Sequence, residues 1–174
     1  MKVSIIGYSG SGKSTLAAAF GRRYGLPVLH LDRVKFSAGW TERSQPDMLA
    51  DVQAFLDCNR DGWVIDGNYT RLWYDRRMRE SDLIFFLDFG RWVCLRRVVS
   101  RFVRYHGQTR DSMGEGCVEK IDLPFLCWVL KDGRTKDIRQ RYADVLHTWP
   151  RKARRIANQR ELNDCYRQYD LTPL

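Results

Sequence analysis

Short apolar runs alternate along the chain with longer stretches in which apolar residues recur every three or four positions. The short runs predict buried strands, and the longer stretches predict amphipathic helices. We expect strands at residues 3–6, 28–31, 63–65, 83–87 and 155–157. Regular alternation of this kind is typical of an α/β domain with a largely parallel sheet.

Capping signals support three of the expected helices. The helix over Lys13–Tyr24 stops at Gly25, a residue type that suits a left-handed C-cap. Ser44 and Asn158 each precede an acidic residue three positions further on, so each predicts the N-cap of a helix. Residues 33–46 follow neither period and are expected to be irregular.

Three further helices are expected around the middle and later part of the chain. One spans residues 91–105, with Asp88 before it as a candidate N-cap. The second begins near Pro124, a favourable first position, and stops at Gly133, and the third carries an apolar stripe that includes Tyr142. The buried stripe of the 91–105 helix is expected to comprise Trp92, Leu95, Val99 and Phe102.

Composition narrows the class of protein. The 174 residues are 44 % hydrophobic and 29 % charged, which fits one globular domain over residues 1–174. No apolar run approaches the ~18 residues of a membrane span, and the first residues carry no secretory signal, so we expect a cytoplasmic protein. The five scattered cysteines lack any Cys-x-x-Cys spacing, which favours free thiols over a disulfide framework or a zinc ribbon.

Basic residues are concentrated in the second half of the chain. Residues 1–88 hold 12 Lys or Arg against 11 Asp or Glu, whereas residues 89–174 hold 18 against 10. Residues 89–110 contain six arginines and no acid. A positive field of this kind favours anionic partners, either nucleotides or nucleic acid.

The strongest chemical signal is the segment Gly-Tyr-Ser-Gly-Ser-Gly-Lys-Ser at residues 7–14, between the first expected strand and the first expected helix. It matches the phosphate-binding pattern Gly-x4-Gly-Lys-Ser/Thr, in which backbone N–H groups and a helix N-terminus surround a β-phosphate. Lys13 can reach the β- and γ-phosphates, the Ser14 hydroxyl can coordinate Mg²⁺, and Thr15 can bond a more distal phosphate. The candidate nucleotide-binding residues of this loop are Gly7, Ser9, Gly10, Ser11, Gly12, Lys13, Ser14 and Thr15.

The reaction must be inferred from other residues. The chain has no Asn-Lys-x-Asp motif of guanine-specific GTPases and no Leu-Ser-Gly-Gly-Gln transporter signature, and it is short for a ring ATPase. A small kinase is the class that remains. Such an enzyme must align an acceptor with the γ-phosphate and neutralise charge on the transferring group.

Acidic residues follow the expected strands. Ligands of open α/β sheets collect at the carboxyl ends of strands, where Asp32 and Asp66 fall. Asp32 is a candidate to orient an acceptor hydroxyl or accept its proton, and Asp66 to hold the water shell of Mg²⁺. His30 is expected to be a hydrogen-bonded interior histidine rather than a base.

Arginines are the candidates to neutralise phosphate charge. Arg97, Arg101 and Arg104 are spaced by four and three residues, which places them on one face of the expected helix. Their mutual repulsion would be relieved by a bound polyanion, and a solvated basic face is the alternative. Arg110, in the stretch that follows, could reach phosphates when a flap closes.

Several of these motifs occur together in one known group. Residues 7–15, His30-Leu31-Asp32 with Gly39-Trp40 downstream, Asp66-Gly67-Asn68-Tyr69 followed by Arg71, and Arg97 with Arg101 resemble adenylate-kinase-like P-loop kinases. The pattern is most similar to the family labelled "DNA topology modulation protein". The resemblance implies a P-loop fold with a five-stranded parallel sheet in the order 2-3-1-4-5 and helices on both faces. It also implies ATP in the loop, Arg97 and Arg101 beside the adenine and phosphates, and a short lid over residues 104–118.

We therefore interpret the chain as a Mg·ATP-dependent phosphotransferase with a small-molecule acceptor beside segment 33–46. That segment is short for a mononucleotide subdomain, so AMP is not the expected acceptor. Alternatives from other classes are an ATP-binding, nucleic-acid-associated regulator of DNA topology, and a nucleotide-binding protein without turnover. The candidate catalytic residues are Lys13, Asp32, Arg97, Arg101 and Arg110; the acceptor residues are Asp32, Trp40, Asn68, Tyr69 and Arg71; the metal residues are Ser14 and Asp66.

Overall fold

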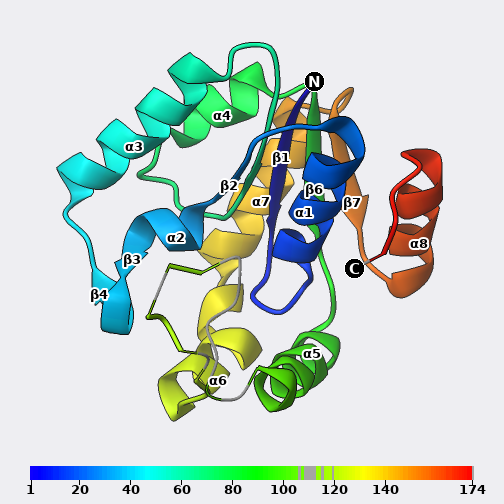
Figure 1. Ribbon diagram of the computed structural model, residues 1–174. Helices are drawn as coiled ribbons and strands as arrows, with labels where there is room; N and C mark the ends of the chain where they lie inside the picture. The colour runs from blue at the N-terminus through cyan, green and yellow to red at the C-terminus, as the bar shows by residue number, and fades with distance from the viewer. Residues whose placement is uncertain (106, 108–112, 115, 119, 174) are drawn as a thin grey trace.

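A five-stranded sheet forms the centre of the computed structural model, which describes residues 1–105, 107, 113–114, 116–118 and 120–173. Its neighbouring strands are all parallel, in the order β2-β5-β1-β6-β7 (Figure 1). The predicted α/β class with a five-stranded parallel sheet is confirmed. The strands are β1 (Lys2–Gly7), β2 (Val28–His30), β5 (Trp63–Asp66), β6 (Leu83–Leu87) and β7 (Ala153–Ile156).

The strand labels differ from the predicted 2-3-1-4-5 because a small hairpin lies outside the main sheet. Its strands, β3 (Phe36–Ser37) and β4 (Thr41–Glu42), pair with each other in antiparallel fashion. A 3-10 turn, η1 (Ala38–Trp40), connects them. Counted within the main sheet alone, the five strands follow the order that the sequence predicted.

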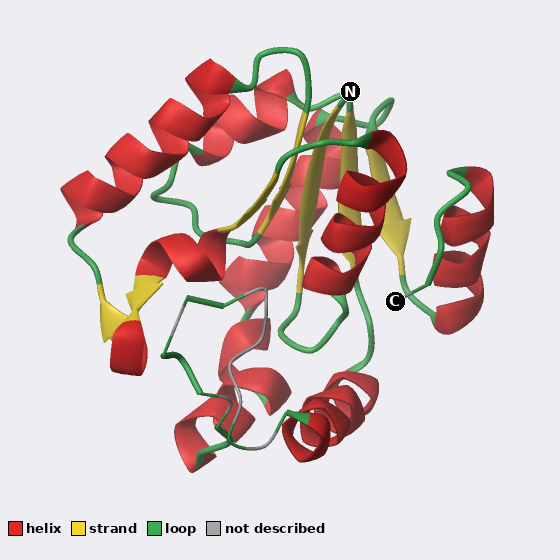
Figure 2. Cartoon of the chain, viewed as in Figure 1, coloured by secondary structure: helices red, strands yellow, loops and turns green. Residues whose placement is uncertain are grey.

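Helices cover both faces of the main sheet (Figure 2). In Figure 1, α1 lies in front of the sheet and α7 behind it. Among the described residues, none of the helices combines the length and the apolar character that crossing a bilayer requires. The helices are α1 (Lys13–Tyr24), α2 (Leu31–Lys35), α3 (Gln45–Cys58), α4 (Tyr74–Glu80), α5 (Arg91–Arg104), α6 (Leu123–Leu130), α7 (Lys136–Thr148) and α8 (Gln159–Gln168), with η2 at Asp132–Arg134.

The alternation of side chains along β5 divides the core in two. Val64 belongs to the cluster that includes Phe20 of α1, whereas Trp63 and Ile65 belong to the cluster that includes Leu56 of α3. All five side chains are at most 1 % exposed. Burial of each side chain contributes about 1.5–3 kcal/mol to the stability of the fold, so the apolar residues of β5 stabilise both clusters at once.

The caps predicted at Ser44, Asn158 and Gly25 are confirmed. The Ser44 hydroxyl accepts a hydrogen bond from Asp47 N at 3.3 Å, and the Asn158 side chain accepts one from Glu161 N at 3.0 Å. Gly25 ends α1 in the left-handed region, with φ +63°. The five cysteines are also free, as expected.

Two expectations about the first half of the chain are wrong. Residues 33–46 are not irregular, because they contain most of α2, the β3–β4 hairpin and the start of α3. Asp32 does not end a strand: β2 stops at His30, and Asp32 lies in the first turn of α2. Helix α4 was not expected, because five of its seven residues are arginine or acidic and its one buried apolar residue is Met78.

Asp88 is not the N-cap of α5. Gly90 occupies that position, and a carboxylate oxygen of Asp88 instead accepts a hydrogen bond from Arg155 Nε at 2.6 Å. The interaction joins the end of β6 to β7. Asp88 therefore stabilises the contact between β6 and the edge strand β7 and does not cap α5.

The buried stripe of α5 also differs from the expected one. Trp92 is 70 % exposed and Val99 44 % exposed, whereas Cys94 and Val98 are fully buried. The helix is turned by its contact with Gly10, where an added Cβ would come within 2.6 Å of the Cys94 carbonyl oxygen. Such a close approach brings the small side chains of α5 inward and leaves no room for the Trp92 indole.

Lys152 provides a test of how the sheet edge is anchored. Its ammonium group donates hydrogen bonds to the carbonyl oxygens of Met78, Arg79 and Ser81, at 2.7, 2.8 and 2.8 Å, and so satisfies the C-terminus of α4. We expect Lys152→Met to lower the free energy of unfolding by about 2 kcal/mol in a urea titration, because charged hydrogen bonds are lost. Lys131→Met, at an exposed lysine, should change it by less than about 0.5 kcal/mol. Equal stability of the two variants would contradict the anchoring role.

Candidate active site

The loop between β1 and α1 is shaped by glycines that no other residue could replace without strain. Gly7, Gly10 and Gly12 have φ values of +144°, +77° and +98°. A Cβ on Gly7 would lie 2.4 Å from the Leu87 carbonyl oxygen. No side chain caps the start of α1, because its N-cap is Gly12. The first-turn N–H groups, which have no partner within a helix, therefore remain available to an anion.

The side chain of Lys13, the first residue of α1, folds back onto this loop. Its ammonium group donates a hydrogen bond to the Tyr8 carbonyl oxygen at 3.0 Å. Burial lowers the pKa of Lys13, and the carboxylates of Asp32 and Asp66 oppose that shift. The cation is thus held in a partly desolvated position, where a bound anion would stabilise its charge.

The two candidate metal residues are in direct contact. The Ser14 hydroxyl donates to one carboxylate oxygen of Asp66 at 2.7 Å, and His30 Nδ1 lies 2.5 Å from the other. Asp66 is 4 % exposed, so both contacts of its carboxylate are buried. His30 is an interior hydrogen-bonded residue, as expected. A hydroxyl beside a carboxylate is a donor set that fits Mg²⁺, which takes one or two protein oxygens together with water and phosphate.

A second carboxylate faces the loop from α2. Asp32 accepts a hydrogen bond from the Tyr69 hydroxyl at 2.5 Å. Burial, and then the charge of Asp32, raise the pKa of Tyr69, so its hydroxyl stays a donor. The Lys35 ammonium group lies 5.2 Å from the centre of the Tyr69 ring. The pair therefore has a fixed orientation within a partly buried, mixed-charge environment.

Asn68 connects the loop that carries Tyr69 to the glycine-rich loop. Its side-chain oxygen accepts from Gly7 N at 2.9 Å, and its side-chain nitrogen donates to the Gly7 carbonyl oxygen at 2.6 Å. Both polar groups of the amide are directed at the same backbone unit. Arg71, three residues further on, is exposed at the rim.

Trp40 lies where the hairpin meets the segment after α5. Its indole nitrogen donates to the Val118 carbonyl oxygen at 2.9 Å, and Gly39 N donates to the Gly116 carbonyl oxygen at 3.1 Å. The Trp40 ring also packs edge-on against Phe36, with centroids 5.4 Å apart. The hairpin and the described part of segment 104–118 therefore contact each other directly.

Arg97 of α5 contacts the glycine-rich loop itself. Its guanidinium donates to the Ser11 carbonyl oxygen and to the Gln159 side chain, each at 2.7 Å, and lies 4.0 Å over the Phe89 ring. Burial lowers the pKa of Arg97. Arg101 lines the same space. Arg110 lies outside the described residues.

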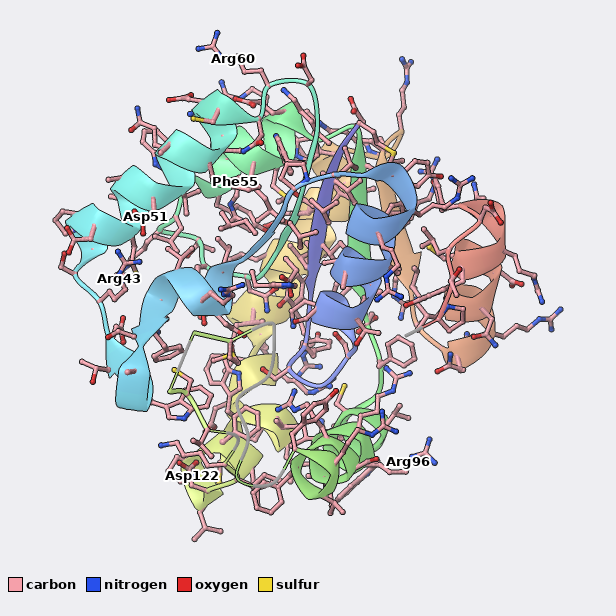
Figure 3. All side chains as sticks on the ribbon, in the orientation of Figure 1. Arg43, Asp51, Phe55, Arg60, Arg96 and Asp122 are labelled. Atoms are coloured by element: carbon pink, nitrogen blue, oxygen red, sulfur yellow. The ribbon has the colours of Figure 1, made fainter. Side chains whose placement is uncertain are left out.

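A cleft of about 2280 Å³ collects these groups and extends from the hairpin to α8. Gly7, Ser11 and Asp66 lie behind its surface rather than in its lining. At the hairpin end, Arg43 is held by Asp51 at 2.6 Å (Figure 3). The candidate residues that line the cleft are Ser9, Gly10, Gly12, Lys13, Ser14, Thr15, Asp32, Trp40, Asn68, Tyr69, Arg71, Arg97 and Arg101.

Sequence reasoning missed two residues of distant segments that contact the loop. Arg134 of η2 lies 3.8 Å over the Tyr8 ring and donates to the Phe89 carbonyl oxygen at 3.0 Å. Trp128 of α6 donates to the Ser9 hydroxyl at 3.2 Å. Neither residue belongs to a recognisable motif, and each comes from a segment more than a hundred residues away in the chain, so no local signal could have identified them.

Comparison with known proteins supports the fold but not a particular family. No protein-family model matches the chain, and no curated protein matches its sequence. The resemblance to the "DNA topology modulation protein" family is therefore not confirmed. Among solved structures, the chain is similar to deoxyadenosine kinase from M. mycoides with bound dATP, at 13 % identity and a TM-score of 0.54, over 98 % of this chain and 100 % of that one.

Two other solved structures are comparably similar. A gluconokinase from Sinorhizobium meliloti 1021 has 16 % identity and a TM-score of 0.51, over 97 % of this chain and 88 % of that one. An uncharacterized protein from Eubacterium ventriosum ATCC 27560 has 13 % identity and a TM-score of 0.52, over 97 % of each chain. At these identities the likeness shows a shared fold.

Lys13→Met tests whether the loop binds phosphate. We expect calorimetry to detect binding of inorganic tripolyphosphate to the unsubstituted protein and none to the variant. The pKa of Lys13 is lower in the native state than in the unfolded chain, so the charged form costs stability below that native pKa. Removing the charge should therefore leave the unfolding temperature of the ligand-free protein unchanged or higher.

Lys131→Met, at an exposed lysine outside the cleft lining, is the matched control and should bind tripolyphosphate normally. Retained binding in Lys13→Met, with a normal fold, would show that the loop is not the phosphate site.

Proposed function

We propose that this protein is an ATP-dependent kinase that phosphorylates a hydroxyl group of a small molecule. The observation that carries the proposal is the position of Asp32, in the same cleft as the glycine-rich loop and Lys13. One wall offers backbone N–H groups and cations to a triphosphate, and the other offers a carboxylate to a hydroxyl. Catalysis of phosphoryl transfer consists largely of such positioning and charge stabilisation.

The phosphate side binds and neutralises the nucleotide. The N-terminus of α1 and Lys13 would bind the β- and γ-phosphates, while Arg101 lines the same space beyond Arg97. Mg²⁺, held by Ser14 and the adjacent Asp66, would add charge neutralisation on the phosphates when bound. Arg97 acts here by holding the Ser11 carbonyl oxygen, which keeps the loop curved.

The acceptor side supplies the base. Asp32 would accept the proton of the acceptor hydroxyl while the hydroxyl oxygen attacks the γ-phosphorus. The bond between the γ-phosphorus and the oxygen that bridges it to the β-phosphate then breaks, and ADP is released. The Tyr69 hydroxyl bonds to one carboxylate oxygen of Asp32, and no residue in the described part of the chain donates to the second oxygen, which would face the acceptor. Tyr69 therefore orients the base.

Nucleosides and sugars are the acceptors that the cleft fits best. Phe36, Trp40 and Tyr69 line the acceptor side and offer flat apolar surfaces to a base or a sugar ring. Two similar structures are named as a deoxyadenosine kinase and a gluconokinase. We retain membership of the adenylate-kinase-like group, and of the "DNA topology modulation protein" family, as part of this proposal.

Nucleic-acid binding is the second candidate, and the net charge of +9 is the observation in its favour. Against it, the α5 arginines with the expected spacing turn toward the cleft, and Arg97 is already bonded to Ser11 and Gln159. A salt titration of DNA binding separates the two functions. A log–log slope of several units that ATP does not change would favour nucleic acid, because each neutralised phosphate contributes ~0.9.

Asp32→Asn tests the assignment of the base. In an assay of ADP formation with a panel of nucleosides and sugars, we expect turnover with the accepted substrate to fall about 100-fold or more, because the amide cannot accept the proton. The dissociation constant for Mg·ATP should stay within about twofold, since Asp32 is expected to contact the acceptor and not the nucleotide. Asp61→Asn, at an exposed carboxylate, is the control and should be fully active. If the unsubstituted protein consumes no ATP with any acceptor of the panel, the kinase assignment is overturned.

A further inference from the structure

Arg77 of α4 is a fully buried arginine beneath the candidate active site, with an exposed fraction of 0 %. In the described part of the chain no carboxylate pairs with it. Its guanidinium donates instead to the carbonyl oxygens of Leu72 at 2.9 Å, Tyr69 at 2.8 Å and Gly67 at 3.4 Å. Three separate points of the loop that joins β5 to α4 thus converge on one side chain.

A buried guanidinium without an acid is an expensive way to stabilise a loop. Burial lowers the pKa of Arg77 to about 10, which reflects the cost of keeping the charge away from water. What the side chain provides in return is geometry, because its planar fork presents donors in several fixed directions at once. An apolar residue offers no donor, and a lysine would present its donors from a single nitrogen, whereas the three carbonyl groups here are bonded by three different nitrogens of the guanidinium.

The loop that Arg77 holds carries the two side chains that connect the halves of the site. Asn68 bonds to both polar groups of Gly7, where the phosphate loop begins. Tyr69 bonds to Asp32, the candidate base. Gly67 fixes the start of the loop, since a Cβ there would lie 2.8 Å from Leu31 Cβ. Arg77 bonds to the carbonyl groups of Gly67 and Tyr69, which lie directly beside the two side chains that make these contacts.

We propose that Arg77 is the positioning residue of the site: by holding residues 67–72 it sets the placement of Asp32 relative to the phosphate loop. The inference rests on the kinase function proposed above. Arg77 does not line the cleft, so its effect passes through Asn68 and Tyr69. Misplacement of reacting groups by about 1 Å costs roughly 100-fold in rate, so a rigid connection of this kind matters for transfer more than for binding of ATP.

Arg77→Lys keeps the charge but removes the fork, and it is the variant that tests the proposal. Without nucleotide, we expect the Gly7 amide hydrogen to exchange at least about tenfold faster by NMR, because the Asn68 acceptor is no longer held. The Val64 amide, bonded to the Pro27 carbonyl oxygen in the sheet, should exchange as before. The dissociation constant for Mg·ATP should stay within about threefold, while kcat for ADP formation falls about tenfold or more.

Arg79→Lys is the matched control, at an exposed arginine of the same helix, and should behave as the unsubstituted protein. Unchanged Gly7 exchange in Arg77→Lys, or a loss of turnover no larger than the loss of ATP affinity, would overturn the proposal. Should Arg77→Lys fail to fold, Asn68→Ala tests the same link, and normal kcat in that variant would overturn it. Failure of the kinase function itself would appear differently, as absence of ATP binding and turnover in the unsubstituted protein.

Discussion

The close approach of the glycine-rich loop to its neighbours is the constraint on which the rest of the site depends. Gly7 and Gly10 contact the backbone of β6 and of α5 at distances that leave no space for a side chain. These contacts place α5 directly behind the loop. The small buried side chains of α5 pack against Gly10. The arginines about one turn away on the same helix therefore face the cleft. A steric requirement in the backbone thus determines where the positive charge lies.

The electrostatics of the cleft follow from that arrangement. Burial lowers the pKa of both Lys13 and Arg97, so each cation is held at a cost that an anionic ligand would reduce. The two carboxylates near these cations lie in separate places. Asp66 is engaged by Ser14 and His30 below the loop, and Asp32 by Tyr69 on the opposite wall. One region therefore suits phosphate and the other a neutral hydroxyl, which is the division of charge that a kinase needs.

Much of this architecture could be predicted from the sequence, because it depends on local signals. The main strands and α1 follow from hydrophobic periodicity, and the caps at Ser44 and Asn158 follow from side-chain chemistry within one helical turn. The glycine-rich loop was equally readable, since its function requires particular residue types at fixed spacing. The position of Asp66 at the carboxyl end of a strand, where ligands of parallel sheets collect, was also predicted, whereas its hydrogen bond with Ser14 was not.

The rest depends on contacts between distant segments. Trp92 has the same hydrophobicity whether it faces the core or solvent, and its orientation is decided by the contact of α5 with Gly10. The hairpin at residues 36–42 is too short for a strand period to be recognised, and it is held by hydrogen bonds to residues 116–118. Arg77 and Arg134 read as ordinary surface arginines in the sequence. Only the fold shows that each donates to carbonyl groups beneath the site.

The central claim is that a phosphate loop and a catalytic carboxylate act on one reaction within one cleft. The most direct measurement is ³¹P NMR of the unsubstituted protein with Mg·ATP and pools of nucleosides or sugars. For at least one pool, we expect the γ-phosphate signal to be replaced by a new phosphomonoester resonance together with the signals of ADP. Conversion of ATP only to inorganic phosphate, or no change in the ATP signals with any pool, would contradict it.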